Sequence, residues 1–592
     1  MLTNVRHGRS ARNAVSICAA QAQGATVSDQ DSRQANAWDQ EVDWIVVGSG
    51  GGGMTSALTA RHRGLSTLIL EKSAYVGGST ARSGGCVWIP NNYLSLEGGL
   101  PDSPELARAY MAATVGDRTP AALQEAYLKH GPDMIAFLRD HSAMHFEWSR
   151  GYADYYPEAP GGFADGRALE PLPFDGHLLG ENFKYLRRPV MLGVRYTSIS
   201  LRRVQILGGF RRHASGRRQL LRTIADTVRN VLTRKAMLTM GQGVAGRLYY
   251  SVLQAGIPVE RETPLTRLIV EDGRVTGVEV LRQFQPRRYR ARRGVLLAAG
   301  GFAHNQAMRD QYHPQPSRAD WSIAVESDTG DGIRAGQAVG GNVDLMEDAW
   351  WGPVSQVGGQ RYPNFAVTER STPGSLMVNS QGERFVNEAA PYSDVVHRIH
   401  ELHASSGVSH VPCWIILDRT NRNSYLLGLA PPALPLPPRY FEHGDFYKAD
   451  SLGALAAQIG VPADRLRASV QTFNRYAESG VDPDFHRGES AYDRIFGDPH
   501  FRNPNLAPVS TPPFYAIKLY PGDIGTRGGL VTNARAQVLD EQGRVIEGLW
   551  ATGNSMASVM GHSYPGPGAT IGPSMTFGYI AALAAAGKLD AP

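Results

Sequence analysis

Residues 44–54, Trp-Ile-Val-Val-Gly-Ser-Gly-Gly-Gly-Gly-Met, decide the fold. The first four residues predict a buried strand, and the glycines that follow satisfy the spacing Gly-x-Gly-x-x-Gly at Gly48, Gly50 and Gly53. The first glycine permits a tight turn, the second lets a pyrophosphate approach the backbone, and the third allows close packing of helix on strand. A helix is predicted over Met54–Arg63, and its N-terminus favours the charge of a phosphate.

A second strand and an acidic residue complete the unit. Ser66–Leu70 is an apolar strand that ends at Glu71, 23 residues after Gly48. A carboxylate at that place accepts hydrogen bonds from ribose hydroxyls. Strand, glycines, helix, strand and acid in this order predict an α/β dinucleotide-binding domain, but they do not separate NAD from FAD.

Composition and charge exclude several classes of protein. The chain has 592 residues, 42% hydrophobic and 19% charged, so it is not mainly disordered. Its three cysteines, Cys18, Cys86 and Cys413, lie too far apart for a disulfide framework or a zinc finger, and no metal site is predicted. No apolar run approaches the ~18 residues of a membrane span. We therefore expect a cytoplasmic protein that does not cross the bilayer.

A basic insert stands out against this background. Residues 187–235 hold thirteen Lys or Arg and one acid, Asp226, a local net charge of +12, whereas the whole chain carries +5. From Leu220 the apolar spacing is helical, with Arg222 and Arg229 between the apolar residues. Such a helix suits the inner face of the cell membrane as a peripheral contact. The alternative is an insert packed on the protein's own body with its arginines in solvent.

The order of the segments predicts a discontinuous layout. A hairpin is expected at Leu265–Val270 and Val275–Val280, an apolar strand at Gly294–Ala299, and mixed helix and loop from about 340 to 515. The chain should close with a helix from Gly572 to Gly587. The predicted division is a disordered extension or processed leader over 1–40, a cofactor domain over 41–345 and 520–592, and a catalytic domain over 346–519.

Two long runs carry a resemblance to a known family. They are Phe385–Tyr392, Phe-Val-Asn-Glu-Ala-Ala-Pro-Tyr, and Gly561–Pro573, Gly-His-Ser-Tyr-Pro-Gly-Pro-Gly-Ala-Thr-Ile-Gly-Pro. With the glycine motifs, they make residues 42–590 resemble the flavoprotein subunits of fumarate reductases and succinate dehydrogenases. The chain is more closely similar to the 3-ketosteroid Δ1-dehydrogenases. The resemblance implies a Rossmann-like FAD-binding domain interrupted by an α+β catalytic domain.

The resemblance also implies how FAD is held. In succinate dehydrogenases a His-Thr pair links covalently to FAD, but the comparable loop here carries Ser79-Thr80, so non-covalent FAD is expected. The residues expected to bind it are Gly48, Ser49, Gly50, Gly52, Gly53, Glu71, Lys72, Ser73, Gly78, Ser79, Thr80, Ser83, Gly84, Gly85, Gly300, Gly301, Asp331, Gly553, Asn554, Thr570 and Ile571.

Two tyrosines distinguish this chain from the fumarate reductases of that broad family. Fumarate reductases place an arginine five residues after the Asn of an Arg-Phe-x-Asn-Glu motif, where this chain has Tyr392. The position of a second arginine of the fumarate reductases is occupied here by Tyr564. A phenol cannot replace a bidentate cation that grips a dicarboxylate, whereas it suits an apolar ketone.

The ketosteroid dehydrogenase pattern implies a role for each residue. Tyr392 matches the base that takes a proton from C2 of the steroid, and Tyr155, or its neighbour Tyr156, matches a partner that assists it. Tyr564 and the backbone N–H of Gly568 match the pair that binds the C3 oxygen. A hydride then passes from C1 to the flavin N5. A tyrosine base must ionise, and the sequence does not indicate what favours the phenolate.

The alternatives are a Δ4-(5α)-ketosteroid dehydrogenase and a fumarate- or urocanate-type reductase. A nucleic-acid-binding protein is not expected, because no base-stacking or groove-entering motif accompanies the basic insert. The steroid side chain at C17 and the electron acceptor, with a quinone as one candidate, stay open.

Overall fold

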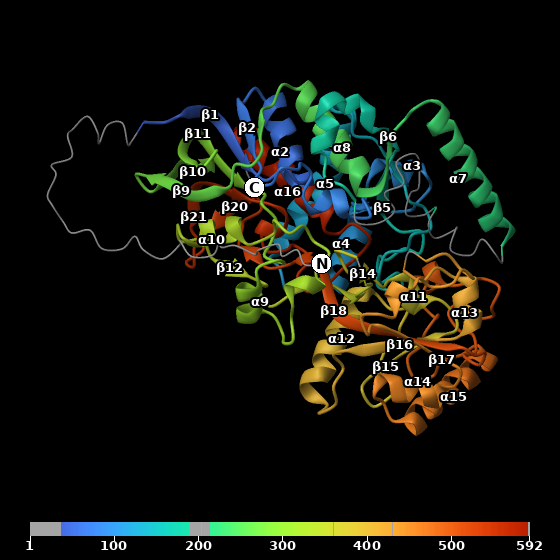
Figure 1. The fold of residues 1–592 in the computed structure, drawn as a ribbon. Helices are drawn as coiled ribbons and strands as arrows, with labels where there is room; N and C mark the ends of the chain where they lie inside the picture. Colours follow the sequence, from blue (N-terminus) through green and yellow to red (C-terminus); the bar gives the residue numbers. More distant parts are fainter. Residues whose placement is uncertain (1–36, 190–202, 204–212, 359, 429, 590–592) are drawn as a thin grey trace, which may run out of the picture.

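The computed structural model describes residues 37–189, 203, 213–358, 360–428 and 430–589. Residues 1–36 of the predicted extension and most of the first half of the basic insert lie outside this range. Figure 1 shows two units, a larger one that holds both ends of the described chain and a smaller one below it.

The larger unit is built on an eight-stranded sheet. Its order is β20-β21-β11-β1-β2-β8, with β10 beside β11 and β9 beside β10. The central neighbours are parallel, and Val47, Leu70, Leu297 and Ala551 are register partners at their carboxyl ends. The strands are β1 (Gln40–Val47), β2 (Thr67–Leu70), β8 (Val259–Glu260), β9 (Leu265–Glu271), β10 (Arg274–Arg282), β11 (Gln285–Leu297), β20 (Gln537–Leu539) and β21 (Val545–Ala551).

The predicted strands of this sheet are confirmed, and four of them, β1, β9, β10 and β11, are longer than expected. β1 begins at Gln40 because Gln40–Val42 pair with Tyr289–Ala291. The same pairing extends β11 toward its N-terminus. The predicted hairpin of β9 and β10 is present, with positive φ at Asp272 and Gly273.

Two helices cross with their backbones in contact beside the sheet. They are α2 (Gly51–His62) and α16 (Ile571–Ala585), and α5 (Ala121–His141) and α8 (Met240–Gln254) pack against them. A Cβ built on Gly52 would lie 2.4 Å from the Ser574 carbonyl oxygen, and one on Gly578 would lie 2.3 Å from the Gly52 oxygen. The helix α2 therefore begins at Gly51, earlier than the predicted Met54, because its first glycines also form this contact.

The smaller unit contains a six-stranded antiparallel sheet, where the sequence predicted mixed helix and loop. The order is β14-β13-β18-β16-β15, with β17 also paired to β18. The prediction failed because short strands such as Ser375–Val378 and Cys413–Leu417 are buried along their whole length and show no alternation. The strands are β13 (Ala349–Ser355), β14 (Asn364–Phe365), β15 (Ser375–Val378), β16 (Cys413–Leu417), β17 (Phe446–Ala449) and β18 (Phe514–Thr526).

The helices α11 (Thr368–Ser371), α12 (Tyr392–Ser405), α13 (Arg419–Ser424), α14 (Leu452–Ile459) and α15 (Ala463–Ser479) belong to this unit. The predicted boundary between residues 519 and 520 falls within β18, which is continuous from Phe514 to Thr526. The division into domains stays a prediction. The other elements are β3 (Val87–Trp88), α3 (Tyr93–Glu97), α4 (Pro104–Thr114), β4 (Phe146–Trp148), β5 (Ala168–Pro171), β6 (Phe174–Asp175), α7 (Ala214–Leu232), β7 (Met237–Leu238), α9 (Gln306–Tyr312), α10 (Asp331–Gln337), β12 (Val343–Asp344) and β19 (Gly529–Leu530).

Helix α7 lies at the margin of the molecule (Figure 1) and confirms the helix predicted in the basic insert. Its buried residues are small or polar: Gly216, Gln219, Thr223 and Asn230. Leu220 is half-buried, but the other large apolar side chains of α7 are exposed: Leu221 67%, Ile224 50%, Val228 53%, Val231 48% and Leu232 78%. Most of the apolar face of α7 is therefore not packed on the part of the chain that the structure describes. Within the described ranges, no helix is both long and apolar enough to span a bilayer.

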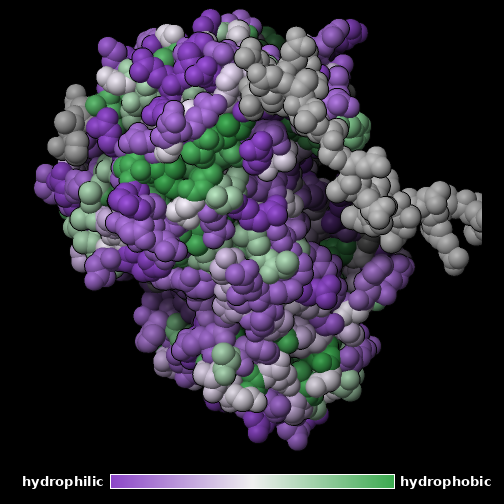
Figure 2. All heavy atoms as spheres, turned by 90° about the vertical axis from the view of Figure 1, so that its left-hand side faces the viewer, coloured by the Kyte–Doolittle hydropathy of each residue, from purple (hydrophilic) through white to green (hydrophobic). Residues whose placement is uncertain are grey.

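Apolar residues are also exposed far from α7. Figure 2 views the molecule from the side where β9 and β10 lie in Figure 1, and hydrophobic residues gather there in a patch within a hydrophilic surface. The exposed large hydrophobic residues of β9, β10 and the turn after β10 are Val270, Leu281 and Phe284. Val270 lies beside the turn between β9 and β10, whereas Leu281 and Phe284 lie at the opposite end of β10, so these residues are exposed separately. They form a second group of exposed apolar residues with which α7 can be compared.

Candidate active site

The carboxyl ends of the four parallel strands bring the glycine motifs to one edge of the sheet. Gly48 follows β1 with φ +113°, and a Cβ there would lie 2.1 Å from the Ala298 carbonyl oxygen. Above Gly50 the space is open, since the nearest atom to an added Cβ is Thr80 Oγ1 at 3.8 Å. The backbone is closed toward the sheet and open outward, the form needed for a pyrophosphate to approach it.

The N-terminus of α2 points to this opening. The helix begins without a side-chain cap at Gly50, and Thr80 Oγ1 accepts from the Gly51 N–H at 3.0 Å. Unpaired N–H groups and the helix dipole favour an anion at such an end. These residues fit the pyrophosphate of FAD.

Glu71 lies beside the glycine turn, as the sequence predicted. Its carboxylate is buried and accepts from the Ser49 hydroxyl at 2.6 Å and from the Ser73 N–H at 2.9 Å. Lys72 is turned away from this carboxylate and forms an ion pair with Asp331 at the start of α10. Glu71 is thus fixed at the end of β2, where a ribose is expected.

The other predicted cofactor residues lie on two sides of the glycine turn. Gly553 and Asn554 follow β21 and, with Thr570 before α16, line a pocket that also contains Trp350. The Trp350 indole N–H donates to Asn554 Oδ1 at 3.1 Å. On the other side lie the 3₁₀ turn that holds Ser79 and Thr80 and its neighbours Gly78, Ser83, Gly84 and Gly85. Gly300 and Gly301 follow β11, and Gly301 lies beside Asn554 on the first side, where Ile571 directly follows Thr570 at the start of α16.

Sequence reasoning missed Asp328 at this edge. Its buried carboxylate accepts from the Ser79 hydroxyl at 3.0 Å, and a Cβ on Gly300 would lie 2.5 Å from it. Burial raises the pKa of Asp328 to about 7, although the Ser79 hydrogen bond lowers it. No motif marks this residue, and its only sequence signal is that it lies three positions before Asp331, a predicted cofactor residue.

The three predicted tyrosines meet in one buried cluster. The Tyr155 hydroxyl donates to the Tyr392 hydroxyl at 3.0 Å. The Tyr564 ring stacks on Tyr155 with centroids 5.0 Å apart, and it meets Tyr392 edge-on at 5.3 Å. Tyr392 is the first residue of α12, whereas Tyr155 and Tyr564 come from loops of the larger unit. The cluster therefore lies where the two units meet.

The geometry distinguishes the two neighbouring tyrosines that the sequence left open. Tyr156 directs its hydroxyl to Asp394 Oδ1 at 2.9 Å, while Tyr155 is the one that contacts Tyr392. Only Tyr155 therefore has the position of a partner for Tyr392.

Gly568 lies in the turn that follows Tyr564. Its φ is +97°, and a Cβ there would lie 2.3 Å from the Cys86 carbonyl oxygen. Among the described residues, no acceptor is bound to the Gly568 N–H. The position therefore requires glycine and leaves its amide available as a donor.

Burial dominates the ionisation of the cluster. It raises the pKa of Tyr392 well above the usual value near 10, and the hydrogen bond from Tyr155 lowers it only in part. Burial also raises the pKa of Tyr564, against hydrogen bonds with Tyr392 and Thr570. A phenolate in this cluster needs a positive charge nearby.

Arg370, which sequence reasoning also missed, is a buried cation beside this cluster. Its buried guanidinium donates to the carbonyl oxygens of Glu388 and Ala390, shortly before Tyr392. Its Nε and Nη2 have no hydrogen-bond partner in the described structure. Burial lowers the pKa of Arg370, while Tyr492, Asp493 and Tyr392 oppose that effect. A lone arginine outside any motif carries no sequence signal.

Tyr492 is a further tyrosine of the cluster that the sequence did not indicate. Its ring centroid lies 4.7 Å from that of Tyr155. Burial raises the pKa of Tyr492, and the charge of Arg370 opposes the rise. Arg370 therefore stands beside the tyrosines as a cation without a carboxylate bound to it among the described residues.

The sheet edge and the tyrosine cluster together define a flavoprotein oxidoreductase. The family model described as "FAD binding domain" matches residues 43–571. A 3-oxosteroid 1-dehydrogenase of Mycobacterium tuberculosis is 45% identical over 92% of this chain and 98% of its own length. The chain belongs to the 3-oxosteroid 1-dehydrogenase family of FAD-binding proteins, which confirms the resemblance, the fold class and the cofactor.

Solved structures agree with this assignment. The 3-ketosteroid Δ1-dehydrogenase of Sterolibacterium denitrificans, solved with 1,4-androstadiene-3,17-dione, has a TM-score of 0.89 and 39% identity over 93% of this chain and 100% of its own. The 3-ketosteroid-Δ4-(5α)-dehydrogenase of Rhodococcus jostii RHA1 has a TM-score of 0.64 and 21% identity over 94% of this chain and 99% of its own, a likeness of fold alone.

Proposed function

We propose that the enzyme introduces a C1–C2 double bond into 3-ketosteroids. One observation carries the mechanism: the Tyr155 hydroxyl donates to Tyr392 inside a buried tyrosine cluster. A proton next to a ketone is removed easily only when the charge that develops on the ketone oxygen is stabilised. The cluster offers a base and two donors within one apolar site.

Tyr392 takes the proton from C2. Tyr155 holds the Tyr392 oxygen by its hydrogen bond and so fixes the direction from which that oxygen meets the steroid. The buried charge of Arg370 and the N-terminus of α12, whose first residue is Tyr392, favour the phenolate. These features oppose the effect of burial on the pKa of Tyr392.

Tyr564 and Gly568 bind the C3 oxygen. A phenol hydroxyl and a backbone N–H form an oxyanion hole for the enolate charge. Bound FAD supplies the acceptor for the hydride that leaves C1. The residues that would hold it are those of the glycine edge, with Glu71 at the ribose. Water is excluded from the cluster because all three tyrosines are buried.

The reaction is tested by dye-linked dehydrogenation of steroids that differ at C17 and at C4–C5. A 4-en-3-one should give the 1,4-diene, identified by NMR. A saturated 5α-3-ketone that gains only a C4–C5 double bond would instead support the Δ4 activity. The proposal would be overturned if the enzyme turned over no 3-ketosteroid in this assay, or if it reduced fumarate instead.

We further propose that α7 holds the enzyme at an anionic membrane surface. Its exposed apolar residues can enter the interface while Arg222 and Arg229 remain at the headgroups. Each cation near such a surface contributes ~1 kcal/mol. Steroids concentrate in membranes, and a quinone electron acceptor would lie in the same phase.

A further inference from the structure

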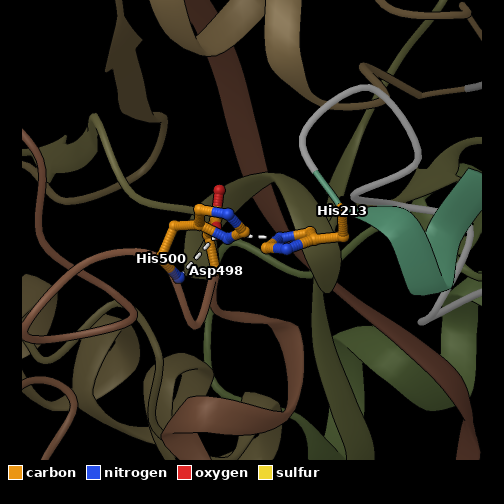
Figure 3. Close-up of side chains that lie close together, drawn as sticks. All are labelled: His213, Asp498 and His500. Carbon is orange, nitrogen blue, oxygen red and sulfur yellow. Dashed lines mark hydrogen bonds and ion pairs between the residues drawn. The ribbon is translucent and has the colours of Figure 1, made fainter.

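Three potential metal ligands outside the tyrosine cluster converge on one point (Figure 3). His213 directly precedes α7, whereas Asp498 and His500 lie in a loop of the smaller unit. His213 Nε2 lies 2.9 Å from Asp498 Oδ1, and His500 Nδ1 lies 3.6 Å from the same oxygen. The two imidazole rings are 4.1 Å apart between centroids. Two histidines and one carboxylate thus share a single centre.

The carboxylate is held in place from behind. The Tyr425 hydroxyl donates to Asp498 Oδ2 at 2.6 Å, which leaves Oδ1 on the side of the imidazoles. The Asp498 N–H donates to the Pro504 oxygen at 2.7 Å, and the His500 N–H donates to Asp498 Oδ1 at 3.0 Å. Ligands of bound metals commonly have such outer hydrogen bonds that fix their orientation.

The separations suit a transition metal. With metal–ligand bonds of about 2.0–2.2 Å, tetrahedral ligands are about 3.3–3.6 Å apart. The separation of 3.6 Å between His500 Nδ1 and Asp498 Oδ1 fits this range, and that of 2.9 Å from His213 Nε2 is shorter, so His213 must move slightly outward when an ion binds. The side chains of His213 and Asp498 are 13% and 1% exposed, but that of His500 is 58% exposed. The buried pair gives two fixed ligands, and the exposed histidine leaves a path for an ion and a place for water.

We propose that His213, Asp498 and His500 bind one divalent transition-metal ion, with Zn²⁺ as the best fit. Imidazole and carboxylate ligands favour Zn²⁺ over Mg²⁺ or Ca²⁺, which prefer oxygen ligands alone. The fourth position is taken by water. The site does not depend on the proposed steroid reaction.

Such an ion would join two parts of the molecule near the tyrosine cluster. His213 is the residue directly before α7 in the basic insert. The loop that holds Asp498 follows the 3₁₀ turn at Asp493–Phe496, next to Tyr492. Tyr492 packs on Tyr155 at 4.7 Å, and Phe496 meets Tyr152 at 6.5 Å. The ion would therefore fix the loop behind these rings, a structural role rather than a catalytic one.

The experiment uses the FAD-loaded full chain, without an affinity tag and freed of metal by a chelator. Titration with Zn²⁺ by calorimetry should give one site per chain, and Mg²⁺ should give none. His500→Gln removes an exposed ligand and should weaken binding more than ~100-fold, beyond the ~10–100-fold expected for the outer partner change Tyr425→Phe. His213→Gln should have the same effect as His500→Gln.

The matched control is His486→Gln. His486 also pairs with a carboxylate, Glu489 at 3.2 Å, but belongs to no three-ligand group in the part of the chain that the structure describes. It should bind Zn²⁺ as the wild type does. Absence of Zn²⁺ binding by the wild type, or equal binding by wild type, His213→Gln and His500→Gln, would overturn the proposal and leave an ion pair only.

Discussion

The hydroxyl of Tyr155 donates a hydrogen bond to that of Tyr392 at 3.0 Å, although the two residues are 237 positions apart. The contact places an acidic donor on the oxygen that we propose as the base. It joins a loop of the larger unit to the first residue of α12 in the smaller one. The hydrogen-bonded pair of Tyr155 and Tyr392 therefore forms only when both units are in place.

Removal of the proposed base should nearly abolish turnover. Tyr392→Phe is expected to lower kcat by at least ~10²-fold, the low end for a lost acid–base group. Flavin content should not change, because Tyr392 is not among the residues of the glycine edge. Tyr476→Phe serves as the control, because Tyr476 is a half-buried residue of α15 outside the tyrosine cluster. Near wild-type kcat in Tyr392→Phe would show that another group takes the proton.

Loss of one donor to the C3 oxygen should raise the barrier. Tyr564→Phe removes a hydroxyl from the proposed oxyanion hole, which should cost about 2.7–4 kcal/mol of transition-state stabilisation. The stacking on Tyr155 is retained by the phenyl ring. Steady-state kinetics give the value from kcat/KM. A change in KM alone, with kcat intact, would contradict a role in the transition state.

The pH profile should report the buried base. Because burial raises the pKa of Tyr392, little phenolate exists at pH 7, and the ionised fraction grows about tenfold per pH unit below that pKa. We therefore expect kcat/KM to rise with pH on the alkaline side. Tyr392→Phe should remove this rise. A profile that is flat from pH 7 to 10 in the wild type would exclude Tyr392 as the titrating base.

Arg370 should move that profile. Arg370→Gln removes the positive charge that favours the phenolate, so the rise should shift to higher pH, with kcat/KM at pH 8 at least ~10-fold lower. Arg370→Lys should restore part of it. Arg422→Gln is the control, since Arg422 is also buried and donates to backbone carbonyls, those of Pro431 and Leu434. An equal loss of activity at every pH would indicate a purely structural role.

The flavin should be lost when the glycine turn is blocked. Gly48→Ala places a Cβ against the Ala298 oxygen at a φ of +113°, so the purified variant should be colourless. Gly273→Ala is the matched control, because Gly273 has φ +76° and nothing within 4 Å of an added Cβ. Acid denaturation of the yellow wild type should release intact FAD. Flavin that stays with the precipitated protein would contradict non-covalent binding.

Membrane binding should depend on the exposed face of α7. The wild type should sediment with anionic phosphatidylglycerol vesicles and not with phosphatidylcholine, and salt should weaken binding. The triple change Ile224→Ser, Val228→Ser and Val231→Ser should release it. Serines at Val270, Leu281 and Phe284, the other exposed apolar group, should not. Wild-type protein that stays in the supernatant at low salt would exclude this docking.

The sequence by itself determined the cofactor edge of this protein. Gly48, Gly50 and Glu71 are recognisable because a tight turn, a close backbone approach and a strand-end carboxylate are local requirements, each met within about 30 residues. The helix of the basic insert was readable for the same reason, since its periodicity is local. The six strands of the smaller unit were not, because strands buried on both faces show no alternation.

The tertiary structure alone decided what surrounds the chemistry. That Tyr155 rather than Tyr156 contacts Tyr392 depends on how two distant loops pack. That α7 turns its apolar side outward depends on which face finds a partner in the body of the protein. The effect that we propose for Arg370 depends on its burial, because a guanidinium in water is screened, whereas one in a low-dielectric interior acts more strongly on nearby groups. Such properties arise from long-range packing, which no local pattern encodes.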